Sequence, residues 1–525
     1  MRDTIAANGT HVRSPLGRMD GMSAGSWATG QAWDAGPGAV WPTELASTRT
    51  ASAPQSFRCY DTTDRRGLAH GITLSRHDDA NGGRWTLALP GGDGTTRLTV
   101  EDDPGADPAD AYVVPNHVVE LLRGITLDAP LVPVARFTTM RSRHRLDDDP
   151  DDAAAGGLEI IVDTVASAHP PLSVAEARRL RRCIAVEVVI PAPDARVPAR
   201  IAHALDHAGF VRAALPHALG RAVDTSLPDA EDDSGRGAVV AYLREQLAAM
   251  AIADLSLRID STGSVHAMRV AARRIRSALQ TFGSALDLTE VPPLIDELRE
   301  LGRRLSHARD VEVQWARLSA VANSGAAWPD DPRADAHRTA ALACIDEHFS
   351  ALADAAAGLT RSTLDDDGYL DLRRRLDALT AAATTGPRRT GKVRSSVVQL
   401  TDKVDRHVGR ATKHPDPHPE RVHRARKSAK KLRYALEATT PLAGGRSGRG
   451  RFRDLQDDLG EYQDAVVAAE HLAAMSEQPG HTHSCPTGFA LGALYAHQIA
   501  RRDAVTAGIA PAWRTARRAA RRLHT

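Results

Sequence analysis

The chain has few of the residues that indicate a disulfide-bonded or membrane-spanning protein. Only four cysteines occur in 525 residues, and they are scattered without paired spacing at Cys59, Cys183, Cys344 and Cys485. This pattern excludes a disulfide framework and favours a reducing compartment. No apolar run is long enough to cross a bilayer, and the N-terminus lacks the charged-then-apolar pattern of a signal peptide. We therefore expect a soluble, cytoplasmic protein.

Aromatic residues and lysine are also scarce. Aromatics make up 4% of the chain while hydrophobic residues make up 42%, so its cores must be built from Leu, Val, Ile and Ala, which favours helices. The 67 basic and 66 acidic residues give a net charge of +1, which does not indicate a generic nucleic-acid binder. Only six of the basic residues are lysines, and all six lie between Lys392 and Lys431. Any anion site must therefore arise from local segregation of charge.

Two stretches more than a hundred residues apart have the same unusual pattern of cations. The segments 265–279 and 422–436 align without a gap, with His on His and cation on cation. At 3.6 residues per turn, the polar residues of each segment form one stripe. The stripe of the first segment is His266, Arg269, Arg273 and Arg276, and that of the second is His423, Arg426, Lys430 and Arg433.

The opposite face of each segment is apolar, which predicts two amphipathic helices. Met268, Ala272, Ile275 and Leu279 match Ala425, Ala429, Leu432 and Leu436. A single stripe of cations is more often a solvated face that pairs with the chain's own carboxylates. The duplication, and the near absence of carboxylates inside either helix, instead favour a site for a long anion. Either histidine alone would be a structural residue, and Tyr434 could serve as a donor to the anion or as a packing residue.

Changes in residue composition and pattern along the sequence predict four regions. Residues 1–50 are rich in Gly, Ser, Ala and Thr and are expected to be a disordered tail. Residues 51–222 contain short apolar runs and turns, typical of an α+β domain with an antiparallel sheet or barrel. An acidic, Pro- and Gly-containing linker is expected at 223–238, and an all-α region at 239–525. The match of 301–313 with 455–467 predicts two related helical bundles, about 239–385 and 386–525.

The helical region resembles the CHAD family of α-helical domains. The resemblance depends on both cationic helices, on Arg309-Asp310, on Tyr434-Ala-Leu-Glu437 and on Leu459-Gly-Glu-Tyr-Gln-Asp464. It implies two pseudo-symmetric four-helix bundles whose basic helices bind inorganic polyphosphate. Asp310 and Asp464 are expected to hold neighbouring helices through arginine pairs or caps and to have no chemical role. The implied polyphosphate contacts are His266, Arg269, Arg273, Arg274, Arg276, His423, Arg426, Lys427, Lys430, Lys431, Arg433 and Tyr434.

The region before it resembles a CYTH domain of the triphosphate tunnel metalloenzyme superfamily. The residues that carry this resemblance are Cys59–Thr62, Leu68–Leu74 and Trp85–Pro90, and CYTH followed by CHAD is a familiar bacterial arrangement. The family's opening Glu-x-Glu-x-Lys motif does not occur before Tyr60. The alternative is that the N-terminal tail is a mispredicted start that replaced the true first strand. Metal-assisted triphosphate chemistry needs several converging carboxylates. The residual ones are Glu159, Asp163 and Glu187, so we expect a degenerate domain that requires Mg or Mn only if it retains activity.

Two other motifs give weak indications of function. Gly386–Val393 approaches a P-loop but lacks its Ser or Thr and follows a helical segment, so it is interpreted as a basic loop. His481, His483 and Cys485 are residues of metal-ligand types, but they lie in a loop and their spacing is poor for zinc.

Taken with both resemblances, the sequence predicts a non-catalytic polyphosphate-binding protein, placed in the cytoplasm or at polyphosphate granules. A divalent-metal-dependent triphosphate hydrolase and a nucleic-acid binder are the alternatives, and the sequence does not give the oligomeric state.

Overall fold

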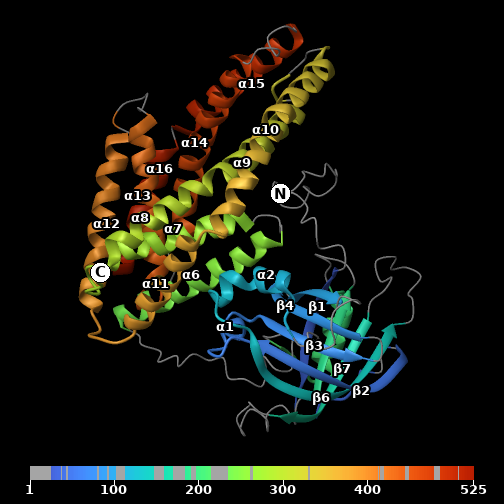
Figure 1. Ribbon diagram of the computed structural model, residues 1–525. Coiled ribbons are helices and arrows are strands. Elements are labelled where there is room, and N and C mark those ends of the chain that lie inside the picture. The colour runs from blue at the N-terminus through green and yellow to red at the C-terminus, as the bar shows by residue number, and fades with distance from the viewer. Residues whose placement is uncertain are drawn as a thin grey trace. The chain divides into compact units, whose positions relative to one another are not determined.

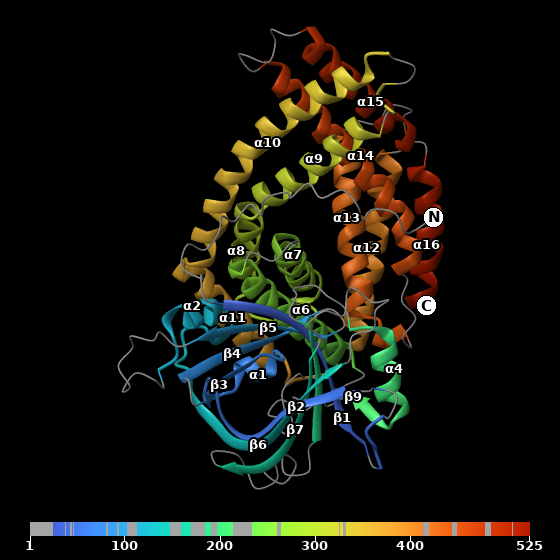
Figure 2. The ribbon, with the colours of Figure 1, turned by 90° about the vertical axis from the view of Figure 1, so that its right-hand side faces the viewer.

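The structure is a computed structural model, and the chain divides into two compact units, Met19–Asp229 and a second unit that contains Ala230–Thr525. The elements of both units are labelled in Figure 1, and Figure 2 gives the view at 90°. The residues that the structure describes are 25–36, 38–42, 45, 47–79, 82–91, 94–101, 113–146, 159–169, 184–190, 197–213, 234–259, 264–324, 326–328, 332–411, 413, 419–443, 449–477, 485–506 and 508–524.

The first unit is built on an antiparallel sheet of nine strands in the order β5-β4-β3-β2-β6-β7-β8-β1-β9. The first half of β1 also pairs with β5, from Gly25 opposite Val100 to Gly30 opposite Thr95, so the pairing passes around eight strands and returns to β5. The strands are β1 (Gly25–Ala35), β2 (Ser47–Asp61), β3 (Thr73–Asp79), β4 (Gly82–Gly91), β5 (Gly94–Glu101), β6 (Val132–Leu146), β7 (Glu159–His169), β8 (Ile184–Ile190) and β9 (Phe210–Arg212).

Among the described residues of this unit, three helices accompany the sheet, α1 (Arg66–Ala69), α2 (Asn116–Thr126) and α4 (Ala199–His207). Helix α4 packs Ile201 and Leu205 against Trp33, Val186 and Val188 of β1 and β8. The short helix α1 is held by Asp61, whose carboxylate accepts hydrogen bonds from three backbone N–H groups at 2.7 to 2.9 Å. The predicted α+β class with an antiparallel sheet is confirmed, whereas its assignment to a CYTH-type barrel stays a prediction.

The expected disordered tail is wrong for residues 25–35, which form β1. Trp33 of this strand is completely buried, and its indole N–H donates to Asp206 Oδ1 at 2.8 Å. Gly and Ala, which make up five of the eleven residues of β1, have low intrinsic strand propensity, and β1 forms because β5, β8 and β9 pair with it. The earlier residues, 1–24, lie outside the described part of the chain. The strand contains no glutamate, so no Glu-x-Glu-x-Lys motif is hidden in it.

The second unit is helical throughout its described residues. Ser234, within the expected linker, already caps its first helix by accepting a hydrogen bond from Gly237 N. The helices are α6 (Gly235–Arg258), α7 (Ser264–Phe282), α8 (Val291–Arg304), α9 (Ser306–Asn323), α10 (Ala334–Leu364), α11 (Asp367–Ala382), α12 (Thr390–Ala411), α13 (Pro419–Ala438), α14 (Arg449–Glu477), α15 (Cys485–Thr506) and α16 (Ile509–His524), with a 3₁₀ turn at Pro441–Ala443.

The helices do not separate into one bundle for each half of the sequence. Helices α9 and α10 of the first half share a core with α14 and α15 of the second, in which Leu318, Ile345 and Phe349 pack with Leu472 and Leu494. Figure 2 shows these four helices together at the end of the unit that carries the α15 label. The expected pair of independent pseudo-symmetric bundles is therefore not confirmed. Helical periodicity identifies the apolar face of α10 but cannot identify the helix that covers it.

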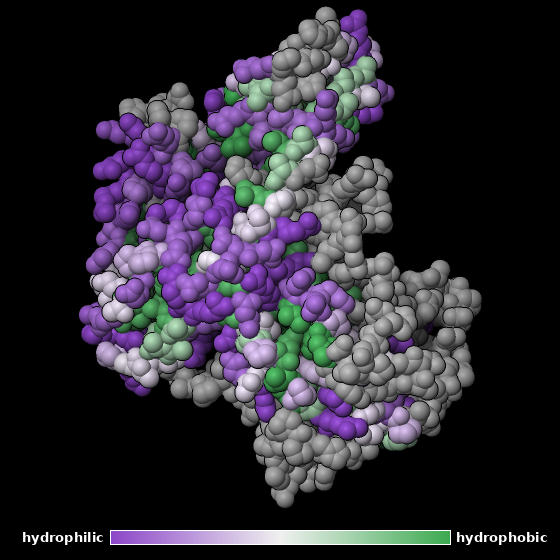
Figure 3. All heavy atoms as spheres, viewed as in Figure 1, coloured by the Kyte–Doolittle hydropathy of each residue, from purple (hydrophilic) through white to green (hydrophobic). Residues whose placement is uncertain are grey.

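The surface of the helical unit is mainly hydrophilic on the face seen in Figure 3, where hydrophobic residues appear only in smaller areas. This agrees with amphipathic helices whose apolar stripes are buried between neighbours. Among the described residues, no helix is both long enough and apolar enough to cross a membrane.

Candidate functional site: a cationic pocket between α7, α12 and α13

The two cationic segments are the helices α7 and α13, and both bury the predicted apolar face. Met268 and Ile275 of α7 are inaccessible to solvent, as are Ala425, Ala429 and Leu432 of α13. The cations are half-buried or exposed on the other face of each helix. The amphipathic pattern read from the sequence is therefore confirmed.

The two helices are in direct contact through Tyr434. Its hydroxyl accepts a hydrogen bond of 2.9 Å from Arg273 Nε, across from α7 to α13. The guanidinium carbons of Arg273, Arg274 and Arg433 lie 5.8, 5.7 and 5.0 Å from the centre of its ring. The tyrosine is 2% exposed, so it is a buried aromatic platform that holds cations of both helices.

A pocket of about 380 Å³ opens beside this contact. It takes residues from α7, from α13 and also from α12, which lies beside α13 in Figure 2. No carboxylate is among its lining residues, so its charge is wholly positive. The lining residues are Arg273, Arg276, Ser277, Gln280, Leu400, Lys403, His407, Arg424, Lys427, Ser428, Lys430, Lys431 and Tyr434.

Sequence reasoning missed the contribution of α12. Lys403 and His407 lie one turn apart on this helix, and His407 Nδ1 lies 3.1 Å from Ser428 Oγ of α13. Their helix lies outside the two matched segments, 265–279 and 422–436, that identified α7 and α13. The confinement of all lysines to residues 392–431 was the one available indication, because that range spans α12 and α13.

In each half, one stripe arginine is paired with a carboxylate of a helix that comes later in the chain. Arg269 of α7 lies 3.2 Å from Asp310 of α9, and Arg426 of α13 lies 3.8 Å from Asp464 of α14. Both aspartates thus hold neighbouring helices, as the sequence predicted. The charge of these two arginines is already partly balanced within the protein.

Glu437 balances a second pair of cations and connects three helices. Its buried carboxylate lies 3.3 Å from Arg274 of α7 and 3.6 Å from Arg433 of α13. It also accepts a hydrogen bond of 3.3 Å from Tyr242 of α6. Glu437 therefore fixes the distance between the two cationic helices from beneath the pocket.

Five pocket-lining cations of α7 and α13 have no such partner in the part of the chain that the structure describes. Within the described residues, no carboxylate lies at ion-pairing distance from Arg273, Arg276, Lys427, Lys430 or Lys431. Burial, and then the charges of Arg299 and Arg273, lower the pKa of Arg276. These cations are therefore crowded and only partly hydrated, which is the condition that a bound polyanion relieves.

The two histidines occupy different environments. His423 lies 3.0 Å from Gln463 Oε1 through its Nδ1 atom, and burial is the main cause that lowers its pKa. His266 is exposed near the start of α7. The structure thus places His423 beside α14 as a positioned polar residue and leaves His266 at the edge of the stripe.

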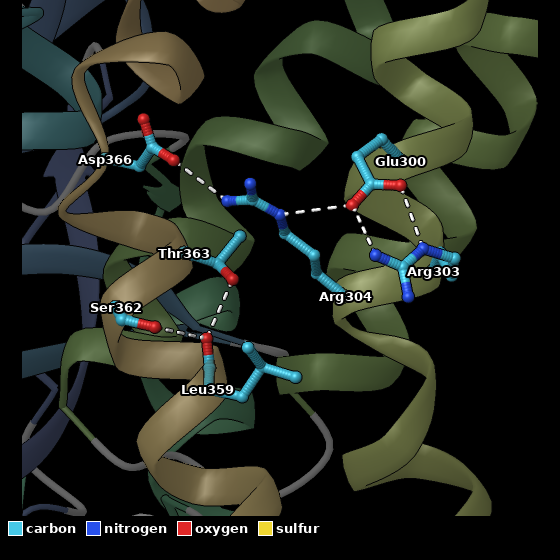
Figure 4. A network of polar contacts seen from close by, with 7 residues as sticks. All are labelled: Glu300, Arg303, Arg304, Leu359, Ser362, Thr363 and Asp366. Atoms are coloured by element: carbon cyan, nitrogen blue, oxygen red, sulfur yellow. Dashed lines mark hydrogen bonds and ion pairs between the residues drawn. The ribbon is translucent and has the colours of Figure 1, made fainter.

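Cations elsewhere in the helical unit show the contrasting, self-neutralised arrangement. On α8, Arg303 and Arg304 both pair with Glu300, and Arg304 also reaches Asp366 at the start of α11 (Figure 4). Hydrogen bonds from the side chain of Arg303 lower the pKa of Glu300 to about 2. This is a solvated face of the kind that a charged stripe usually forms.

The residual carboxylates of the first unit do not form a metal centre in the described residues. Asp163 is occupied by Arg141, which donates to both of its oxygens at 2.8 and 2.6 Å. Glu187 is buried at 6% exposure on β8, and the side chain of Glu159 lies outside the described residues. His481 and His483 and the Cys485 side chain are also outside them. Residues 386–389 form a loop between α11 and α12, as the interpretation as a basic loop predicts, and residues 390–393 begin α12.

Comparison with known proteins agrees with the helical half of this description. The model of the CHAD domain matches residues 241–473. Two uncharacterized proteins of Mycobacterium tuberculosis, MT2285 of strain CDC 1551 / Oshkosh and Rv2226 of strain H37Rv, are each 30% identical over 443 residues, which covers 79% of this chain and 80% of theirs.

Two solved structures each cover 54% of this chain at 23% identity. PptA from Streptomyces chartreusis is covered to 99% with a TM-score of 0.43, and the CHAD domain from the plant Ricinus communis to 92% with a TM-score of 0.41. At these TM-scores they add nothing to the description of the site. The family match and the mycobacterial relatives suffice: the chain belongs to the family of these two proteins and carries a CHAD domain at residues 241–473.

Proposed function

We propose that the helical unit binds inorganic polyphosphate in the pocket between α7, α12 and α13. The observation that carries this proposal is the convergence of cations from three helices on a pocket without a carboxylate. Arginine offers forked donors to phosphate oxygens, and lysine adds a mobile point charge. The stripe from His266 to Arg276 extends over about 15 Å, so it can meet several successive phosphates of a chain.

A linear inorganic chain suits the pocket better than a nucleic acid does. Its one aromatic lining residue, Tyr434, is 2% exposed and covered by arginines, so it presents no face for base stacking. The pocket offers charge and N–H donors, which recognise phosphate oxygens without reading a base. We extend the proposal to a place in the cytoplasm, at polyphosphate granules where these occur.

The test is retention of the full chain on polyphosphate, with two charge-reversed variants. Arg273→Glu with Lys430→Glu removes one cation of each repeated helix and is expected to abolish retention. The matched control is Arg303→Glu with Arg338→Glu, which makes the same change of net charge at exposed, self-paired positions of α8 and α10. The control should be retained like the wild type, and both variants should keep the helical circular dichroism.

Two results would contradict the proposal. Unchanged retention of the Arg273 and Lys430 variant would remove these helices as the site. Displacement of long polyphosphate by duplex DNA at equal phosphate concentration would favour a nucleic-acid function instead.

For the first unit we propose a degenerate CYTH-type domain without triphosphate hydrolysis. Two observations support this proposal: β1 carries no glutamate, and Asp163 is engaged by Arg141. Incubation with tripolyphosphate and with a nucleoside triphosphate, in Mg²⁺ and in Mn²⁺, should release no phosphate. Release that disappears in an Asp163→Asn or Glu187→Gln variant would restore the hydrolase as the function of this unit.

A further inference from the structure

Most of the few lysines of the chain lie in the pocket, where lysine and arginine differ in how readily they lose a proton. Of 67 basic residues only six are lysines, and four of these line the pocket, Lys403, Lys427, Lys430 and Lys431. A guanidinium stays charged in any protein environment, whereas an ammonium group loses its proton readily when it is buried among other cations. The pocket therefore collects four of the six basic side chains of this chain that burial can bring to exchange protons near neutral pH.

Cations surround Lys430 and Lys431 from each helix that contributes to the pocket. Lys430 faces Arg426 and Arg433 of its own helix and Arg273 of α7. The acidic group near it is Asp464 of α14, which is already paired with Arg426.

The surroundings of Lys431 contain cations from two further helices. Lys431 faces Lys403 of α12 and Arg276 of α7. The remaining charged or titratable groups that line the pocket are His407 of α12 and Arg424, Lys427 and Tyr434 of α13. Tyr242 of α6 is bonded to Glu437.

These surroundings lower the pKa of both lysines. Burial, and then Arg426 and Arg273, lower the pKa of Lys430 from its ordinary 10.5 to about 7. Burial, and then Lys403 and Arg276, lower the pKa of Lys431 to about 8. The pKa of His407 is also lowered, mainly by burial, so this histidine exchanges few protons above pH 7.

We propose that anion binding in this pocket is coupled to proton uptake by Lys430 and Lys431. The inference rests on the proposed function and adds its regulation. In the empty pocket, a neutral amine relieves the repulsion among the crowded cations. A bound polyphosphate supplies the missing negative charge, so both amines become ammonium groups and donate to phosphate oxygens. Binding therefore tightens as the pH falls from 9 to 7.

The experiment is calorimetry of the full chain with inorganic polyphosphate of one defined length. Titrations at pH 7.5 in two buffers of different ionisation enthalpy give the number of protons taken up. With pKa values of about 7 and 8, the two lysines together should take up about one proton per site at pH 7.5. The dissociation constant should rise about 500-fold from pH 7 to pH 9.

The decisive variant is Lys430→Arg with Lys431→Arg, which keeps both positive charges but cannot release their protons. It should bind with almost no proton uptake and hold its affinity at pH 9. Lys413→Arg, an exposed lysine outside the pocket, is the matched control and should behave like the wild type. Any protons that polyphosphate itself takes up or releases are the same for the wild type and both variants, so they do not affect the comparison.

Two kinds of outcome would overturn the inference, and they differ in whether the proposed function fails with it. Tight binding by the wild type without proton uptake, or the same uptake in the Lys430→Arg and Lys431→Arg variant, refutes the coupling and leaves the proposed function intact. No binding at any pH refutes the proposed function, and the coupling with it.

Discussion

Glu437→Gln should weaken the fold of the helical unit and at the same time strengthen its binding of polyanions. The buried carboxylate balances Arg274 of α7 and Arg433 of α13 and accepts a hydrogen bond from Tyr242. Glutamine has almost the same shape and can still accept a hydrogen bond, but it removes the negative charge. The substitution therefore separates the role of the charge from that of packing.

The size of the effect follows from the distances. At an effective dielectric constant of about 20, a charge pair at 3.3 Å has a Coulomb energy of about 5 kcal/mol, and one at 3.6 Å slightly less. Most of this is offset by desolvation, and breaking a buried pair typically costs about 3–5 kcal/mol. The side chains of Arg274 and Arg433 are 29% and 30% exposed, so water recovers part of the loss. We expect a loss of about 2–4 kcal/mol in the free energy of unfolding.

Urea unfolding followed at 222 nm measures this loss, because the helical unit dominates the signal. Glu420→Gln is the matched control, since Glu420 is on the same helix and its pair with Arg424 is exposed; it should change stability by less than about 0.5 kcal/mol. Polyphosphate affinity at low salt should rise about fivefold in Glu437→Gln, because two arginines lose their internal partner. A stability loss below about 1 kcal/mol, or weaker binding, would refute the reasoning.

Three further results are expected. Six pocket cations, Lys403 and the five named above, have no carboxylate partner within the described residues. If each meets a phosphate, polyphosphate affinity should fall about 300-fold between 50 and 200 mM salt, and a flat salt titration would contradict this. Because the folded pKa of Lys430 lies below its unfolded value, the unfolded chain holds more protons between pH 7 and 10.5, so the stability of the ligand-free protein should rise by about 1–2 kcal/mol from pH 7 to 9. The rise should be smaller in Lys430→Met, in which the lowered pKa of Lys431 still contributes. Asp61→Ala removes the acceptor of three backbone N–H groups and should cost the first unit about 2–3 kcal/mol, measured by the near-ultraviolet signal of its tryptophans, whereas Asp64→Ala, at an exposed pair, should not.

Local patterns in the sequence were enough to predict most elements of the fold. The runs near Leu74, Trp85, Val100, Ile161 and Val188 are the strands β3, β4, β5, β7 and β8. Helix and strand periods are properties of consecutive residues, so they can be read without tertiary information. The segments that escaped prediction, β1, β2, β6 and β9, depend on pairing with distant strands.

The sequence by itself determined that two helices would each bury an apolar face and carry a matching row of cations. Only the tertiary structure decided which of those cations are neutralised, because Asp310, Asp464 and Glu437 meet their arginines through long-range packing. It also decided that α12 completes the pocket and that Lys430 and Lys431 lose hydration among other cations. The physical reason is that helical periodicity is local, whereas charge balance and desolvation depend on every group that the fold brings near.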